Sequence, residues 1–200
     1  MLKNHNINDL DNFICGWYID EKLCDDMVGY HKNADHRWQA ELRSQGVPSG
    51  ANKAIKNSID CNILDKNLYK RYITELQKCV DLYCKKYTWV NNISKWRVIE
   101  AANLQHYIPP DGGYHAWHCE RCGGSNENNR RVMVFLTYLN NVIDGGETEF
   151  FYQKIKIKAE KGLTIIFPAD WMFVHRGIVS NTQEKYIYTG WFSFVKENNL

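Results

Sequence analysis

The spacing of apolar residues changes near residue 96, and this change constrains the fold more than any other feature of the chain. Residues 20–31 repeat apolar side chains at intervals of three and four behind Asp20, which can serve as an N-cap. Residues 66–87 keep the same helical spacing over a longer stretch. From Trp96 onward the apolar segments shorten, become rich in β-branched and aromatic residues, and are separated by Gly, Pro and Asn. We therefore expect supporting helices followed by an all-β barrel or sandwich.

The second half of the chain predicts about eight strands. In sequence letters they are WRVIEAANLQHY, in one or two parts, GYHAWHCE, RRVMVFLTYLN, GETEFFYQ, KIKIKAE, LTIIFP, MFVHRGI and KYIYTGWFSF. The strict alternation in KIKIK predicts isoleucines that face the core and lysines that face water. Residues 44–62 are interpreted as a long loop with a short strand at 53–58, and residues 121–130 as a polar loop at the mouth of the site.

Composition bounds the class of protein. Two hundred residues, 44% of them hydrophobic, are enough for one domain with a full core. The net charge of +2 does not indicate a nucleic-acid partner. The first residues lack the apolar segment of a secretory signal, and no apolar run is long enough for a membrane span. The seven cysteines, an odd number at irregular spacing, favour reduced thiols. We expect a soluble, cytoplasmic protein.

Two histidines and a carboxylate are the residues that could carry chemistry. Strand alternation would place His118 and Glu120 on one face and Cys119 on the other. If His175 arrives from a neighbouring strand, two imidazoles and one carboxylate converge and leave three positions of an octahedral metal open. The residues alone also permit a solvent-facing pair and a hydrogen-bonded core histidine.

A zinc site is the second interpretation of this segment. Cys119 and Cys122 form a CxxC that, with His115 or His118, resembles half of a structural zinc site. Such a site needs four ligands, and the chain contains no second pair of the required spacing. We therefore favour the first interpretation.

From about Val98 to Phe194 the chain resembles the prolyl-4-hydroxylase-like branch of the 2-oxoglutarate and Fe(II)-dependent dioxygenases. The matching segments are LQHYIPPDGGYHAWHCE, VFLTYLNNVIDGGETEF and KAEKGLTIIFPADWMFVHRGIVSNTQEKYIYTGWF. The resemblance implies an α+β, mainly β fold with a double-stranded β-helix, or jelly-roll-like, core and N-terminal supporting helices. Residues 1–95 would form the helical support and residues 96–200 the oxygenase core, within one structural domain.

The resemblance also implies roles for particular residues. His118, Glu120 and His175 would be the catalytic iron ligands. Lys185, ten residues beyond His175, would pair with the distal carboxylate of 2-oxoglutarate, because a lysine in an apolar pocket lacks a counter-charge until a dianion binds.

Three hydroxyl side chains are candidates for further contacts with 2-oxoglutarate. Tyr107 and Tyr138 occupy positions where relatives place tyrosines that touch this cosubstrate, and each could instead be a core aromatic. Thr189 shares a strand face with Lys185 and could add a hydroxyl to the same pocket. Trp191 continues that face and is expected to pack behind the site.

Two positions depart from the family pattern. Glu120 stands where most relatives have Asp, so the carboxylate extends one methylene further. Relatives tend to have a tyrosine three residues before the first histidine ligand. Here that place is His115, which we expect to fill space, and the tyrosine is Tyr114.

The function that the resemblance implies is hydroxylation of a C–H bond coupled to conversion of 2-oxoglutarate to succinate. Fe(II), 2-oxoglutarate and O2 would be required, with ascorbate as reductant, and the expected substrate is a peptide or protein. The alternatives are an oxygenase acting on a small molecule, nucleobase or lipid, and a non-catalytic jelly-roll binding module. The sequence does not indicate an oligomeric state.

Overall fold

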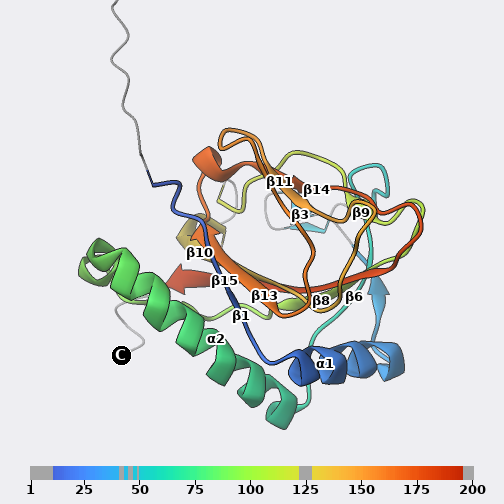
Figure 1. The fold of residues 1–200 in the computed structure, drawn as a ribbon, viewed down its shortest axis with the longest axis horizontal. Coiled ribbons are helices and arrows are strands. Elements are labelled where there is room, and N and C mark those ends of the chain that lie inside the picture. The colour runs from blue at the N-terminus through green and yellow to red at the C-terminus, as the bar shows by residue number, and fades with distance from the viewer. Residues whose placement is uncertain (1–10, 41–42, 45–46, 49, 122–127, 196–200) are drawn as a thin grey trace, which may run out of the picture.

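The computed structural model describes residues 11–40, 43–44, 47–48, 50–121 and 128–195. Two antiparallel sheets face each other, and two helices cover the outer face of the larger sheet (Figure 1). The helices are α1 (Glu21–Asn33) and α2 (Lys66–Lys86). Three short 3-10 helices follow them in the chain: η1 (Thr88–Asn92), η2 (Asn128–Arg130) and η3 (Trp171–Phe173). The fold is α+β and mainly β, as predicted.

The larger sheet has the strand order β1-β13-β10-β15-β8-β6-β2, and β7 also pairs with β15. Its strands are β1 (Cys15–Tyr18), β2 (Trp38–Gln39), β6 (Ile59–Cys61), β7 (Trp96–Val98), β8 (Asn103–Tyr107), β10 (Arg131–Tyr138), β13 (Leu163–Pro168) and β15 (Lys185–Phe194). The smaller sheet has the order β12 (Ile155–Ile157), β11 (Thr148–Phe150) and β14 (His175–Gly177). Two short pairs are β3 (Arg43–Ser44) with β4 (Val47–Pro48), and β5 (Lys56–Asn57) with β9 (Gly113–Tyr114).

Side-chain caps begin both helices. The carboxylate of Asp20 accepts a hydrogen bond from the backbone N–H of Lys22, and Asp65 accepts from Asn67 and Leu68. Both helices lie where the sequence predicts them. The apolar positions of the longer helix are buried, and they include Leu68, Tyr72, Leu76, Val80 and Tyr83.

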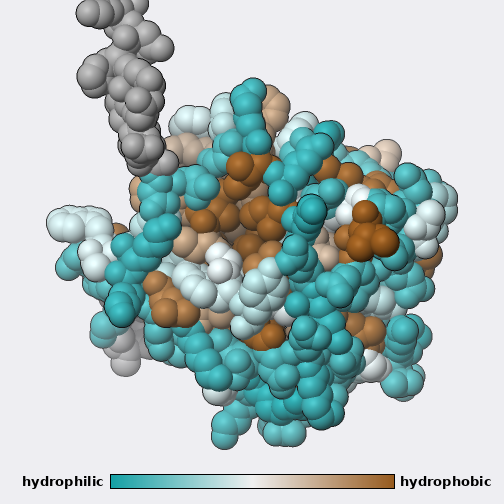
Figure 2. Space-filling view, in the orientation of Figure 1, coloured by the Kyte–Doolittle hydropathy of each residue, from teal (hydrophilic) through white to brown (hydrophobic). Residues whose placement is uncertain are grey.

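Strand alternation divides the interior into two cores. On β10, Phe135 faces the helices, whereas Leu136 and Tyr138 face the smaller sheet. The second core fills the space between the sheets, and Figure 2 shows apolar side chains in a hollow rimmed by polar ones between β11 and β13. Burying each large apolar side chain contributes roughly 1.5–3 kcal/mol. The site forms in this second layer, between the sheets.

A hydrogen bond fastens α2 to the sheet. The Tyr72 hydroxyl lies 2.8 Å from the hydroxyl of Thr137, which lies 2.7 Å from that of Thr164, and all three residues are buried. Because each buried hydroxyl has a partner, none bears the cost of an unpaired polar group.

Several predicted strands are shorter or more divided in the structure. The segment WRVIEAANLQHY forms two strands, β7 and β8, and MFVHRGI contains η3 before its strand begins at His175. The isoleucines of KIKIK are half-buried against the second core and the lysines exposed, as predicted. The 44–62 segment was predicted as a loop with one short strand, but it contains β4 and β6 in addition to β5. Most of the 121–130 loop lies outside the described residues.

The prediction that GYHAWHCE is one strand is wrong. Only Gly113 and Tyr114 form a strand, and His118 makes an isolated bridge. The backbone N–H groups of His115 and Ala116 both donate to Ile55, so successive residues have no regular ladder of partners. The segment changes partner strand as it crosses from β5 to β14, which ends regular pairing.

Neither helix is both long and apolar enough to cross a bilayer, within the part of the chain that the structure describes. The cytoplasmic location stays a prediction.

Strands β1, β2 and β6 come from the N-terminal half and join the larger sheet. The division of the chain at residue 95 stays a prediction as well.

A half-buried histidine lies in the layer between the helices and the larger sheet. The His106 ring stacks on Tyr186, with centroids 4.1 Å apart, and the ring of His31 lies 5.4 Å away. Burial lowers the pKa of His106 to about 4, and the nearby charges of Lys32 and Arg37 act in the same direction. Glu184, 3.6 Å from Nε2, opposes this shift.

We expect this histidine to make the fold acid-sensitive. Because the folded pKa of His106 is below its unfolded value, the unfolded chain binds the proton first and stability falls as pH drops from about 6.5 towards about 4. This amounts to about 2 kcal/mol by pH 5. Urea unfolding at about pH 7.5 and pH 5 measures it, and His106→Phe, which keeps the ring, should lose less stability. Equal losses in the two proteins would contradict this role.

Candidate metal centre

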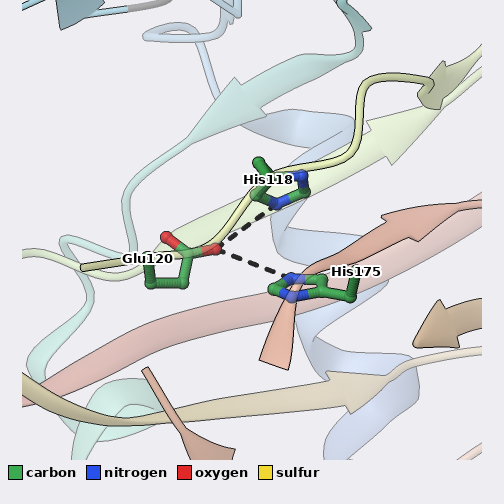
Figure 3. Close-up of side chains that lie close together, drawn as sticks. All are labelled: His118, Glu120 and His175. Carbon is green, nitrogen blue, oxygen red and sulfur yellow. Dashed lines mark ion pairs between the residues drawn. The ribbon is translucent and has the colours of Figure 1, made fainter. Parts of the chain in front are cut away.

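Three side chains that the sequence analysis singled out meet between the sheets. One nitrogen of His118, one of His175 and one carboxylate oxygen of Glu120 all lie within 4.8 Å of one another. Oε1 of Glu120 is 3.5 Å from Nε2 of His118 and 3.7 Å from Nε2 of His175 (Figure 3). His175 begins β14, and the other two follow β9.

The backbone fixes where these side chains begin. His118 donates its N–H to the carbonyl of His175 at 3.0 Å, and His175 donates back to His118 at 2.9 Å. The N–H groups of Glu120 and Arg121 both donate to the carbonyl of Ala169. Backbone hydrogen bonds therefore connect the segments that carry the three side chains, although His118 and Glu120 lie outside any regular strand.

Hydrogen bonds orient both imidazoles with Nε2 towards the carboxylate. Nδ1 of His118 donates to the carbonyl of Ala116 at 3.0 Å, and Nδ1 of His175 donates to Phe173 at 2.8 Å. The proton is thereby held on Nδ1, and the lone pair of Nε2 remains available to a metal ion. The ring of Tyr114 stacks on His118 with centroids 3.6 Å apart, which limits rotation of that imidazole.

Electrostatics favour the protonation states that a metal ion binds. Burial lowers the pKa of His175 to about 4, so its imidazole is neutral at neutral pH. Burial alone would raise the pKa of Glu120, but while the imidazoles are protonated the hydrogen bond to His118 and the charges of His118, His175 and Arg131 lower it to about 2, so the carboxyl loses its proton before the imidazoles do. An anionic carboxylate and a neutral imidazole are the forms that bind divalent cations.

The donor set fits a divalent transition metal. Donors at roughly 2.1 Å from an octahedral ion lie about 3 Å from each other, so the three donors would move closer together to bind one ion. Two imidazoles with one carboxylate form the 2-His-1-carboxylate set, which suits non-haem iron and leaves three positions for other ligands.

A buried lysine lies beside the cluster. Lys185, 4% exposed, donates to the carbonyl of Gly146 at 3.2 Å and lies 4.8 Å above the ring of Tyr107. A Cβ on Gly177, two residues beyond His175, would be 3.5 Å from its Nζ. Burial lowers the pKa of Lys185 to about 8, and no carboxylate among the described residues lies within 4.0 Å of Nζ.

The three hydroxyl groups predicted to contact 2-oxoglutarate each donate a hydrogen bond to another group of the protein. Tyr107 donates to the side chain of Gln105 at 2.6 Å, and Tyr138 donates to Thr148 at 2.6 Å. The hydroxyl of Thr189 donates to a backbone carbonyl of β10 at 3.0 Å. Tyr107 lies beside Lys185 in the paired strands β8 and β15. The roles of all three in binding 2-oxoglutarate stay predictions.

Sequence reasoning missed two residues that contact Glu120. Trp191 was expected to pack behind the site, but its indole N–H donates to Oε2 of Glu120 at 2.9 Å. Arg131 was not singled out, and its Nη1 lies 3.4 Å from the same oxygen. Strand alternation counted from Lys185 does place Trp191 on the same strand face as Lys185, which is the face towards the cluster. Arg131 precedes a register shift between β10 and β15, which the sequence does not reveal.

The remaining candidates have other surroundings. His115 lines a cavity of about 560 Å³ together with Asn57, Asp111 and Asn181. Cys119 is half-buried, and Cys122, the other cysteine of the CxxC, lies outside the described residues.

The family model described as the 2OG-Fe(II) oxygenase superfamily matches residues 102–193. Over this range the chain is similar to the 2OG-Fe(II) oxygenase superfamily. The matched range contains His118, Glu120, His175 and Lys185, so the cluster lies within the oxygenase core. The protein is accordingly an oxidoreductase that uses Fe(II), 2-oxoglutarate and O2. A search of curated protein sequences finds no significant match.

Solved prolyl hydroxylases share the fold of this oxygenase. The viral collagen prolyl hydroxylase of Paramecium bursaria Chlorella virus-1, in complex with 2-oxoglutarate, is 19% identical with a TM-score of 0.66 over 92% of this chain and 97% of its own. A Pseudomonas putida prolyl-4-hydroxylase is 15% identical with a TM-score of 0.67 over 92% and 94%. A Trichoplax adhaerens prolyl hydroxylase, bound to a peptide fragment of the hypoxia inducible factor oxygen degradation domain, is 17% identical with a TM-score of 0.66 over 91% and 84%.

We expect Lys185 to set the pH range in which 2-oxoglutarate binds. Its pKa of about 8 means that the ammonium loses its proton as pH rises, so the affinity for a dianion should fall above about pH 8. Calorimetric titration of 2-oxoglutarate into the Mn(II)-loaded oxygenase at about pH 7 and pH 9 measures the effect. Lys185→Met should weaken binding by about tenfold or more, whereas Lys185→Arg should bind with little pH dependence. Unchanged affinity in the methionine variant would place the carboxylate elsewhere.

Proposed function

We propose that this oxygenase hydroxylates a C–H bond of a peptide substrate, with proline as the first candidate residue. The reaction takes one molecule each of substrate, O2 and 2-oxoglutarate, and it yields the hydroxylated product, succinate and CO2. The observation that carries the proposal is the position of an unpaired buried ammonium, Lys185, beside a cluster of two imidazoles and one carboxylate.

In this proposal His118, Glu120 and His175 hold Fe(II). The bound ion would supply the redox chemistry that activates dioxygen. The backbone hydrogen bonds between His118 and His175, and the carbonyl groups that hold each Nδ1 proton, would keep the donors directed at one bound ion. Three protein ligands would leave positions for 2-oxoglutarate and dioxygen.

Lys185 would orient 2-oxoglutarate. A 2-oxo acid offers two adjacent oxygen donors at one end and a carboxylate at the other, so it can reach a metal ion and an ammonium together. The ammonium is almost fully buried and donates to a neutral carbonyl, so an anionic ligand would relieve the cost of the unpaired charge. Tyr107 and Thr189 would complete the same wall of the pocket.

Exposed aromatic side chains beside the cluster support a peptide substrate. Trp117, which precedes His118, contacts Phe151 edge to face, and Phe151 in turn contacts Tyr152, which contacts Trp171. These four side chains are 38–61% exposed. Aromatic surfaces of this kind bind extended proline-containing segments. Two of the solved structures that share the fold are described as acting on, or bound to, polypeptides.

Succinate formation from 2-oxoglutarate tests the proposal. The purified protein with Fe(II) and ascorbate should produce succinate in a reaction that a chelator stops, and proline-containing peptides should increase it and gain one oxygen atom by mass spectrometry. His175→Ala should lose turnover, because one of three ligands is gone, whereas His36→Ala, remote in sequence and outside the cluster, should retain it. Omitting ascorbate should slow repeated turnover.

The outcomes separate the rival functions. Succinate formation that small molecules, nucleobases or lipids stimulate and peptides do not would overturn the peptide substrate while keeping the oxygenase. A folded, iron-loaded protein that binds 2-oxoglutarate but never converts it would favour a non-catalytic binding module.

A further inference from the structure

The two carboxylate oxygens of Glu120 have different surroundings. Oε1 faces Nε2 of His118 and of His175. Oε2 points the other way and lies 2.9 Å from Nε1 of Trp191 and 3.4 Å from Nη1 of Arg131. Two protein donors thus surround the oxygen that does not face the imidazoles.

Arg131 is itself held in place. Its Nε and Nη2 donate to the carboxylate of Glu100 at 3.1 and 2.6 Å, and its guanidinium carbon lies 3.5 Å from the centre of the Trp191 ring. Nη1 is also 3.3 Å from the backbone carbonyl of Glu120. Ser193 donates to Glu100 at 2.9 Å. The arginine and glutamate side chains are 12% and 17% exposed, so solvent screens this pair little.

A longer carboxylate needs such restraint more than a shorter one. Glutamate has one more rotatable bond than aspartate, so it has more conformations to lose and can approach a metal ion with either or both oxygens. Two bound oxygens would occupy a position that the 2-His-1-carboxylate chemistry needs for other ligands. Holding Oε2 away from the imidazoles leaves Oε1 as the single donor.

We propose that Trp191, Arg131 and Glu100 are positioning residues that hold Glu120 as a one-oxygen metal ligand. We call these three side chains the clamp. Trp191 and Arg131 hold Oε2 directly. Glu100 acts through Arg131, because it occupies Nε and Nη2 and leaves only Nη1 for Glu120. The proposal rests on the metal centre of the proposed function and adds the reason why that centre accepts glutamate.

Mn(II) affinity tests the clamp without requiring turnover. Free Mn(II) gives an electron paramagnetic resonance signal, so titration yields a dissociation constant for each variant. Trp191→Phe removes the indole N–H and keeps a ring, and we expect about tenfold weaker binding. The matched control is Trp96→Phe, because Trp96 lies in the same sheet and its N–H donates to the carbonyl of Val90 instead. The control should bind Mn(II) as the parent does.

A second set of variants covers the case in which Trp191→Phe does not fold. Arg131→Lys keeps the charge and loses the planar fork, and Glu100→Gln frees Arg131 to pair with both oxygens of Glu120, so both should weaken Mn(II) binding severalfold. Arg71→Lys, which alters the half-buried pair with Asp26 on the helices, is the control. Circular dichroism establishes folding.

The outcomes distinguish the clamp from the centre itself. Parent-like affinity in the folded Trp191→Phe protein, or in both Arg131→Lys and Glu100→Gln, would overturn the clamp and leave the metal centre intact. Equal losses in the Trp96→Phe control would also overturn it. A parent protein that does not bind Mn(II) would overturn the centre and the clamp together.

Discussion

Two backbone hydrogen bonds between His118 and His175 are the constraint on which the site depends. They join a segment with little regular structure to the first residue of β14, and so bring residues 57 positions apart to the same point. The imidazoles are then oriented by carbonyls only two residues away in the chain. Because position and orientation both come from the backbone, the geometry exists before any ion binds. Preorganisation of this kind lowers the cost of assembling a metal centre.

The two sheets bury the side chains around these two hydrogen bonds and set their charges. The second core excludes water from His175, which keeps its imidazole neutral, and it isolates the ammonium of Lys185 from solvent. A buried ammonium without a carboxylate partner destabilises the fold, and the larger sheet with its helices compensates through apolar burial. Apolar burial on the helix side of the sheet thus offsets the cost of the buried ammonium on the other side.

The fold and the central residues could be predicted because they leave periodic or spaced signals. Two helical patterns and alternating strands predicted the layers, and the resemblance to the 2-oxoglutarate and Fe(II)-dependent dioxygenases, carried by the positions of His118, Glu120 and His175, predicted the cluster. The strand expected over GYHAWHCE was wrong because its hydrogen-bond partners, such as Ile55, come from segments with no periodic signal. The contact of Arg131 with Glu120 depends on a register shift and two side-chain conformations, which a linear pattern does not encode.

The most direct test of the whole account is a crystal structure of the oxygenase grown without oxygen, with Mn(II) in place of Fe(II) and with 2-oxoglutarate. The account predicts one metal ion bound by Nε2 of His118, Nε2 of His175 and Oε1 of Glu120. It also predicts the distal carboxylate of 2-oxoglutarate on Nζ of Lys185. An ion bound elsewhere, or a 2-oxoglutarate molecule that does not reach Lys185, would contradict it.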